Sequence, residues 1–157
     1  GSAGPLRGGK GSTWEGGVRE PCIIHWPESA KPKSGINQTV WSTLDILPTL
    51  VDLCELDYPS FQIDGISRID EFINGDTPVS KPMMYYSAQG QIEGIRIGNW
   101  KYRDTKEEVF LFNIAEDISE QYNLVNKEQE RAQKMREVML EFDQKITSEL
   151  RKHGTLD

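Results

Sequence analysis

The stretch KGSTWEGGVREP, residues 10–21, closes a glycine-rich opening and carries most of the information about this chain. Glycines recur throughout residues 1–17, and their lack of a Cβ allows close backbone approach and positive φ angles, which is typical of loops. Residues 18–26 follow with Cys22, Ile23 and Ile24 between two prolines, a pattern that predicts a short buried strand. The sequence therefore predicts a loop that leads into a strand of a larger sheet.

Two cations, Arg7 and Lys10, lie in this loop, and no acidic residue precedes Glu15. Free backbone N–H groups and the point charge of a lysine suit an oxyanion of the sulfate or phosphate type. A nucleotide-binding P-loop is disfavoured, because Gly11 stands where the hydroxyl that binds Mg²⁺ belongs and no buried strand comes before it. A solvated, flexible terminus is the alternative interpretation.

Helical periodicity marks the middle of the chain. Apolar residues recur at helical spacing over residues 41–53, where Ser42 or Thr43 can cap the helix and Pro48 either starts a second turn or kinks the first. The run of residues 68–73, which is followed by the helix-ending pair Asn74-Gly75, predicts a second, short helix.

A different pattern begins after a linker expected at residues 76–82. Strand-like runs follow at residues 83–87, 93–97 continued through 100–103, and 109–113. Turns at Gly90 and Gly98 separate them closely, which predicts an antiparallel meander. Residues 127–152 then predict a long amphipathic helix that covers the meander, with an apolar stripe formed by Ala132, Met135, Val138, Met139, Phe142, Ile146 and Leu150.

Composition limits the class of protein. The 157 residues, 36% of them hydrophobic, suffice for one domain or two small subdomains with a real core. A formal charge of −7 argues against a nucleic acid or an anionic membrane surface as partner. No apolar run approaches the roughly 18 residues of a membrane helix, and residues 1–10 lack the apolar core of a signal peptide.

Metal ligands and a nucleophilic triad find little support in the residues. Cys22 and His25 offer only half of a zinc site, and both are expected inside the buried strand, as a free thiol and a hydrogen-bonded core histidine. Cys54 is likewise expected to be buried, and the disulfide state of the two cysteines is left open. The acidic residues 116–123 lack the spacing of a calcium loop and are interpreted as a solvated structural turn.

Residues 10–21, with the run that ends at Trp26-Pro27, strongly resemble the second signature of the type I sulfatases, the arylsulfatase branch of the alkaline phosphatase superfamily. Further matches keep the order of that family, at residues 43–50, 64–67, 95–102 and 111–124. The resemblance implies an α/β fold class, here as an α+β fragment. Residues 1–76 would end a sulfatase α/β domain, and residues 77–157 would form a small antiparallel sheet packed against a long C-terminal helix.

The resemblance also implies a chemistry. In such sulfatases the lysine that matches Lys10 contacts the sulfate ester, so Lys10 is the candidate catalytic and substrate-binding residue. The nucleophile of the family is a hydrated formylglycine made from a Cys/Ser-x-Pro-x-Arg motif, and neither Cys22 nor Cys54 lies in such a motif. The calcium ligands of the family, an early Asp pair and a later Asp-Asn pair, are missing as well. The chain therefore resembles the C-terminal part of a calcium-dependent sulfatase, has no cofactor or metal ligand of its own, and is expected to be inactive alone.

The expected partners are a sulfate ester substrate and the N-terminal remainder of the catalytic domain. Without that remainder we expect the loop around Lys10 to be mobile, and apolar surface on residues 18–24 and 41–53 to favour self-association. Further candidates for substrate binding, with plain solvation as the alternative, lie in the turn between two predicted strands: Gln89, Gln91 and Glu93. Relatives of this class are usually secreted, periplasmic or lysosomal.

Two other functions stay open at this point. A non-catalytic support or interaction module would need only the meander and the terminal helix, and Lys10 would then matter for stability alone. A parent enzyme that hydrolyses phosphoesters is the other alternative, because relatives in the superfamily use similar metal sites. The sequence does not distinguish an aryl sulfate from a carbohydrate sulfate.

Overall fold

The computed structural model describes residues 2–25, 35–73 and 81–149, which belong to two units. One unit combines Gly1–Pro21 with Lys81–Asp157, and the other consists of Cys22–Ser80. Most of the expected linker, the end of the expected strand at Trp26, and Leu150 lie outside the described residues. The predicted domain boundary between residues 76 and 77 stays a prediction.

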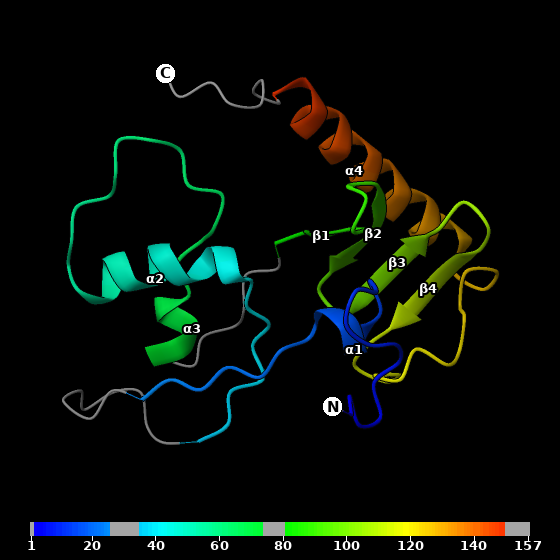
Figure 1. Ribbon diagram of the computed structural model, residues 1–157, viewed down its shortest axis with the longest axis horizontal. Coiled ribbons are helices and arrows are strands. Elements are labelled where there is room, and N and C mark those ends of the chain that lie inside the picture. Colours follow the sequence, from blue (N-terminus) through cyan, green and yellow to red (C-terminus); the bar gives the residue numbers. More distant parts are fainter. Residues whose placement is uncertain (1, 26–34, 74–80, 150–157) are drawn as a thin grey trace. The chain divides into compact units, whose positions relative to one another are not determined.

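The first unit is built on a four-stranded antiparallel sheet in the order β1-β2-β3-β4 (Figure 1). The strands are Met83–Tyr86, Ile92–Ile97, Trp100–Asp104 and Val109–Asn113. The run 93–103 contains a tight turn between β2 and β3, where Gly98 has φ 58°, and Gly90 with φ 75° lies between β1 and β2. The predicted meander is confirmed, and glycine occupies the two turn positions because positive φ costs it little.

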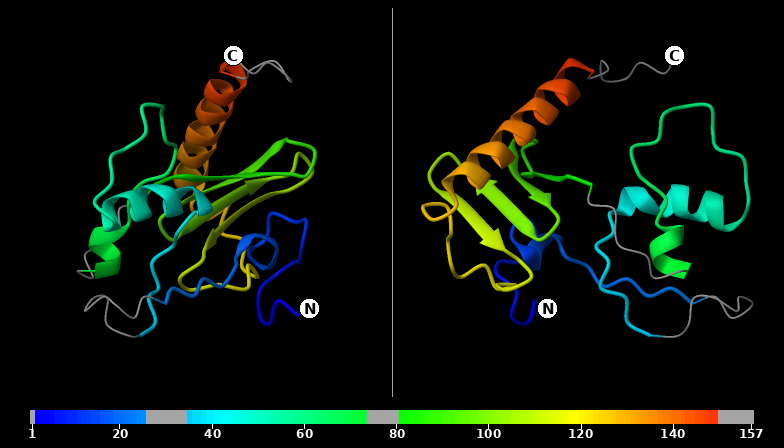
Figure 2. Two further views of the ribbon diagram at one scale, coloured as in Figure 1. Left: turned by 60° about the vertical axis from the view of Figure 1, so that its left-hand side comes forward. Right: turned by 180° about the vertical axis from the view of Figure 1, so that it is seen from behind.

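Helix α4, Gln129–Ser148, lies across one face of this sheet (Figures 1 and 2). Its buried residues Ala132, Met135 and Met139 form the core with three fully buried strand residues, Ile95, Tyr102 and Leu111. The predicted amphipathic helix is confirmed, but its cover is incomplete. Phe142 is 37% exposed and Ile146 38%, so the apolar stripe continues beyond the residues that the core buries.

The N-terminal segment contacts the opposite face of the sheet and contains helix α1, Glu15–Val18. The prediction of a buried strand at residues 18–26 is wrong: Val18 ends the helix, residues 19–25 belong to no strand, and Ile23 is 93% exposed. An apolar run becomes a buried strand only where a neighbouring strand pairs with it, and the described residues supply none. For the same reason Cys22 and His25 are exposed, against expectation.

The second unit consists mainly of short helices. A 3₁₀ turn, Thr43–Asp45, runs into α2, Ile46–Leu53, and Ile69–Ile73 forms α3, so both predicted helices are confirmed. Ser42 is the cap: its side chain accepts the N–H of Leu44, and the carboxylate of Asp45 accepts the N–H of Ser42. Pro48 lies in the first turn of α2, where its missing N–H leaves no intrahelical bond unmade.

A buried ionic cluster holds this second unit together. Arg68, 4% exposed, pairs with Asp45 at 3.1 Å and with Glu71 at 3.0 Å. The hydroxyl of Thr49 accepts the backbone N–H of Arg68, which ties the segment before α3 to α2. Cys54, expected to be buried, is exposed and free just after α2.

Large apolar side chains of the second unit face outward. They include Leu44, Ile46, Leu47 and Leu50, which are 46–57% exposed. This confirms the expected apolar surface along residues 41–53. Among the described residues no helix is both long and apolar enough to cross a membrane.

Candidate functional site

Three cations share the face of the sheet that α4 leaves open. Lys101 and Arg103 are two residues apart on β3 and therefore point to the same side, while Tyr102 between them points toward α4. Arg96 on β2 lies directly opposite Lys101 in the strand register. Cations gathered on a buried surface must be compensated by carboxylates or they destabilise the fold.

Lys101 is the centre of this charge arrangement and is fully buried. Its Nζ lies 2.9 Å from Glu15 Oε1 and 2.9 Å from Glu120 Oε1, and both glutamates are buried. Arg96 reaches the other oxygen of Glu15 at 3.4 Å. Burial, followed by the negative charge of Glu15, raises the pKa of the neighbouring Tyr85, so that the phenol stays neutral beside these ions.

Glu120 connects two parts of the N-terminal segment. Its side chain accepts the backbone N–H of Glu15 at 2.7 Å, and its backbone carbonyl accepts a hydrogen bond from the guanidinium of Arg7 at 2.9 Å. The residue adopts φ 53°, an uncommon conformation for a side chain with a Cβ. The expectation of a solvated turn at residues 116–123 is therefore wrong for Glu120, while the structural role assigned to this turn is confirmed.

The aromatic ring of Trp14 lies between two guanidinium groups. Arg7 is 3.7 Å from the ring centroid and Arg103 is 4.1 Å from it. Phe110 and Phe112 of β4 meet the same ring edge to face, with centroids 5.2 and 5.9 Å away. Trp14 thereby attaches the loop to β3 and β4 through cation–π and aromatic contacts.

A third attachment joins the loop to β2. The hydroxyl of buried Thr13 donates to Glu93 Oε2 at 2.7 Å and accepts from Arg103 Nε at 2.7 Å. Arg103 also pairs with Glu93 at 3.3 Å. Glu93, a candidate for substrate binding, thus has its carboxylate engaged within the protein.

The loop itself is closed at its base. Gly16 donates its N–H to the carbonyl of Arg7 at 2.8 Å. A Cβ on Gly17 would overlap the carbonyl oxygen of Ser12 and come within 2.6 Å of the carbonyl oxygen of Gly9. These contacts close the loop in the structure, and the mobility expected of this segment stays a prediction.

Lys10 lies in this closed loop, which we call the Lys10 loop and define as residues 7–17. Its side chain is exposed and makes no ion pair or hydrogen bond with the described residues. Gln89 and Gln91 are exposed in the turn between β1 and β2. A pocket of 390 Å³ lies between this turn and the loop, and its lining includes Gly11, Ser12 and Thr13 from the loop and Met84–Ala88 from the strand and turn.

The described residues do not form a metal site. None of them gather three or more His, Cys, Asp or Glu side chains in a way that could hold a metal ion. The buried carboxylates of Glu15 and Glu120 already face cations of the protein. The calcium ion implied by the resemblance therefore does not fit the described part of this chain.

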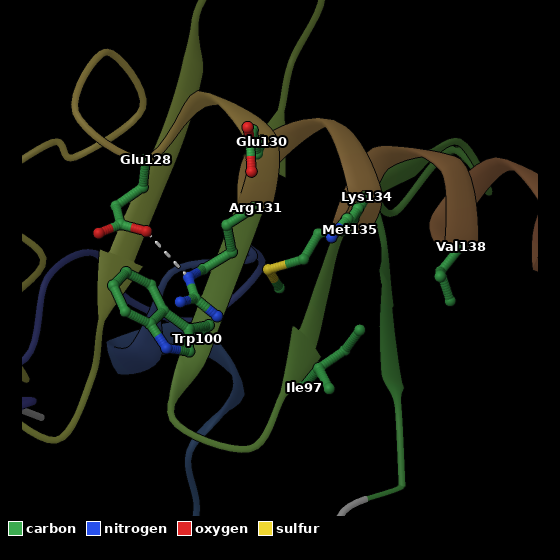
Figure 3. A pocket seen from close by; sticks show the side chains of 8 residues that line it. All are labelled: Ile97, Trp100, Glu128, Glu130, Arg131, Lys134, Met135 and Val138. Atoms are coloured by element: carbon green, nitrogen blue, oxygen red, sulfur yellow. Dashed lines mark hydrogen bonds and ion pairs between the residues drawn. The ribbon is translucent and has the colours of Figure 1, made fainter.

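Another pocket, of 310 Å³, lies between α4 and the face of the sheet that α4 covers (Figure 3). Arg131 covers the ring of Trp100 at 4.2 Å from its centroid and pairs with Glu128 at 3.2 Å. Ile97 and Met135 form its apolar side. It is separated from the Lys10 loop by the sheet and shares no lining residue with the loop pocket.

Comparison with known proteins identifies the class. The profile of the Sulfatase family matches residues 1–56. The alignment with arylsulfatase A from Bos taurus is 153 residues long at 31% identity, and it covers 80% of this chain and 30% of that protein. Arylsulfatase A from Homo sapiens is 31% identical over 152 residues, with the same coverage of both chains. The chain belongs to the sulfatases of the alkaline phosphatase superfamily, as the resemblance implied.

Solved structures agree on the fold. The crystal structure of Ps i-CgsB is 31% identical and superimposes with a TM-score of 0.78, covering 88% of this chain and 32% of that one. The same protein has been solved in complex with k-i-k-neocarrahexaose, with the same coverage and TM-score. The α+β arrangement of sheet and C-terminal helix is thus a sulfatase arrangement. The chain spans about 30% of the length of the curated relatives that it matches first.

Sequence reasoning proposed Lys10, which stays a prediction, and missed the buried Lys101 and Glu120 that hold the loop around it. A signal for Lys101 was present, because a lysine between Trp100 and Tyr102 inside a predicted central strand needs a buried partner or a polar face. Glu120 lies in the stretch 111–124 that matches the family, which was the available signal, but its residue type alone does not distinguish it from Glu116 and Asp117. Its partner Glu15 is 105 residues away.

Proposed function

We propose that this chain is the C-terminal part of a sulfate ester hydrolase and that Lys10 binds the sulfate group of the substrate. The family membership supports the reaction class. The observation that carries the assignment of Lys10 is its exposure without a partner, whereas Arg7, Lys101 and Arg103 are all engaged within the protein. The charge of Lys10 is thus available to an external anion.

The role of Lys10 follows from the chemistry of sulfate ester cleavage. Breaking the S–O bond moves negative charge onto the leaving oxygen, and a positioned cation stabilises that charge in the transition state. Lysine carries a compact charge with three donors on a flexible stem, which suits contact with several sulfate oxygens. Its ammonium would both hold the sulfuryl group and stabilise the departing alkoxide or phenolate.

Other parts of the reaction require groups that this chain does not offer. We infer that the formylglycine nucleophile and the calcium ligands come from the N-terminal remainder of the enzyme, since neither cysteine lies in the required motif and the described residues do not fit a metal site. Lys10 alone can stabilise charge but cannot attack sulfur. The isolated chain is therefore inactive under this proposal.

The pocket beside the Lys10 loop is the proposed place for the alcohol part of the substrate. Lys10, Gln89 and Gln91 are not among the residues that line this pocket. The two glutamines lie in the adjoining turn, and their amide groups can both donate to and accept from hydroxyl groups. A carbohydrate sulfate offers such hydroxyls. The carboxylate of Glu93 holds Thr13 and Arg103, so we assign the substrate contacts to the two glutamines first.

The test compares this chain with the complete, matured sulfatase on an aryl sulfate in the presence of calcium. Activity is expected only in the complete enzyme, and Lys10→Ala should lower kcat by about 10²–10³-fold, as the loss of one charge-stabilising group does. Lys127→Ala is the matched control, because Lys127 is also exposed but lies just before α4. Activity of the isolated chain, or equal kinetics for both variants, would contradict the proposal.

The same assay separates the two alternatives. A support module predicts that Lys10→Ala changes only the unfolding midpoint and leaves kcat unchanged. A phosphoester hydrolase predicts faster turnover of the matching aryl phosphate than of the aryl sulfate.

The apolar surface of the second unit points to the partner. We propose that the N-terminal remainder covers the outward side chains of α2, among them Leu47 and Leu50. Without it, the isolated chain should self-associate, and sedimentation velocity of the wild type against a Leu47→Gln, Leu50→Gln variant tests this. A monomeric wild type at concentrations near 100 μM would contradict the proposed cover.

A further inference from the structure

Glu120 holds the Lys10 loop at both of its ends. Its backbone carbonyl accepts from Arg7 at the start of the loop, and its carboxylate accepts the N–H of Glu15 near the end. Lys10 lies between these two attachment points and itself contacts neither Glu120 nor any other described residue through an ion pair or hydrogen bond. Any effect of Glu120 on Lys10 must therefore pass through the backbone of the loop.

Lys101 attracts the Glu120 carboxylate. Glu120 Oε1 lies 2.9 Å from Lys101 Nζ in an ion pair without hydrogen-bond geometry, while Oε2 accepts the Glu15 N–H, which sets the direction of the carboxylate. Lys101 also binds Glu15 Oε1 at 2.9 Å, which closes a ring of three residues. All three side chains are at most 2% exposed, so water does not compete for these contacts.

Such an arrangement is an inefficient way to gain stability alone. Removing charges from water costs free energy that the ion pair often fails to return, and apolar residues of similar volume are frequently as stable. Charged hydrogen bonds do impose direction and distance, which apolar contacts do not. The buried ring is therefore better suited to setting the position of the loop than to adding stability.

We propose that Glu120 and Lys101 are positioning residues that place Lys10 for contact with the sulfate group. The proposal rests on the assignment of Lys10 as the sulfate-binding residue. It adds that this contact depends on two residues that follow Lys10 by about a hundred positions in the sequence and never touch the substrate. A displacement of about 1 Å at a reacting group can lower the rate by about 100-fold, so modest loosening of the loop has a measurable effect.

The kinetic test is a double-mutant cycle in the complete, matured sulfatase. Glu120→Gln should lower kcat by about 10–100-fold in the wild-type background. In the Lys10→Ala background it should lower kcat by less than about 3-fold, because the group that it positions is already gone. Equal effects of Glu120→Gln in both backgrounds would overturn the proposal, since a merely structural role does not depend on Lys10.

A matched control comes from the other buried ionic cluster. Asp45→Asn removes a partner of Arg68 in the second unit and lowers stability without changing a residue of the ring. Its effect on kcat should be the same fold-change with and without Lys10. Should Glu120→Gln fail to fold, Arg7→Gln removes the first attachment at an exposed residue, and the same non-additivity with Lys10→Ala is expected. Additivity there would also overturn the proposal.

A second readout does not depend on catalysis. In the 157-residue chain, Glu120→Gln should speed amide hydrogen exchange at Glu15 and Gly16 by at least about 10-fold relative to the amides of β3 and β4, since it releases the loop without melting the sheet. Unchanged exchange at these two amides would refute positioning by Glu120. If Lys10→Ala leaves kcat intact while exchange rises as expected, the assignment of Lys10 fails and the attachment of the loop stands.

Discussion

Substitution of Gly17 by alanine tests whether the Lys10 loop packs as the structure shows. The added Cβ would overlap the carbonyl oxygen of Ser12 and lie 2.6 Å from that of Gly9, against about 3.3 Å for an ordinary close C···O contact. The Gly9 side of the loop must therefore move by about 0.7 Å, and the Ser12 side by more. Overpacking of this kind costs up to about 3 kcal/mol.

One effect partly offsets this cost. Gly17 lies in α1, and alanine is a better helix former than glycine by about 1 kcal/mol. The net destabilisation of Gly17→Ala should therefore be about 2 kcal/mol. Gly9→Ala is the matched control in the same loop, because its Cβ would meet nothing within 4 Å and its φ is not positive, so it should be neutral or stabilise by up to about 1 kcal/mol.

Urea-induced unfolding, followed through the NMR amide signals of β3 and β4, measures the first unit by itself. The Gly17→Ala midpoint should fall clearly below that of Gly9→Ala at an unchanged denaturant slope. If the two variants unfold within about 0.5 kcal/mol of each other, the loop is not packed against residue 17 and the reasoning about its closure is refuted.

Three further outcomes are expected. Burial, followed by the Asp104 carboxylate, raises the pKa of Tyr102 to about 12 from 10.0. The stability that the neutral phenol contributes is therefore complete below pH 10 and is lost as the pH rises through 12. Thermal unfolding between pH 9 and 12 should show a flatter alkaline decline in stability for Tyr102→Phe than for the wild type. Asp45→Asn leaves Arg68 with one fewer buried carboxylate and should cost about 3–5 kcal/mol in urea unfolding of the second unit, where a loss below 1 kcal/mol would contradict the buried pair. Met139→Ala empties a core position that is 2% exposed and should lower the stability of the first unit by about 2–5 kcal/mol by the same method; an effect under 1 kcal/mol would mean that α4 does not seal the sheet there.

The sheet and the terminal helix could be predicted because their signals are local. Glycines at 90 and 98 mark the turns, and the alternation around Lys101 and Tyr102 gives the two faces of β3. The apolar run at residues 22–24 misled the prediction, because its composition suits a strand while pairing depends on a neighbour that composition does not reveal.

The candidate site was predictable only in part. Lys10 came from a resemblance over residues 10–21, which names the residue but not what holds it. Glu15, to which sequence reasoning gave no role, pairs with Arg96 and Lys101. Partners 81 and 86 residues away are fixed by the register of β2 and β3 against the loop, and no single-sequence pattern carries that information.

The attachment of the Lys10 loop to Glu120 also sets an order of events during synthesis. The residue that completes the loop is made 105 positions after Glu15, and at about 5–20 residues per second it follows about 5–20 s later. Throughout that interval the nascent loop lacks the carbonyl that accepts from Arg7 and the carboxylate that accepts the Glu15 N–H. Under the proposed role of Glu120, Lys10 acquires its final position only after residue 120 has been made, and truncated products that end before Glu120 would carry Lys10 without the residue that holds its loop.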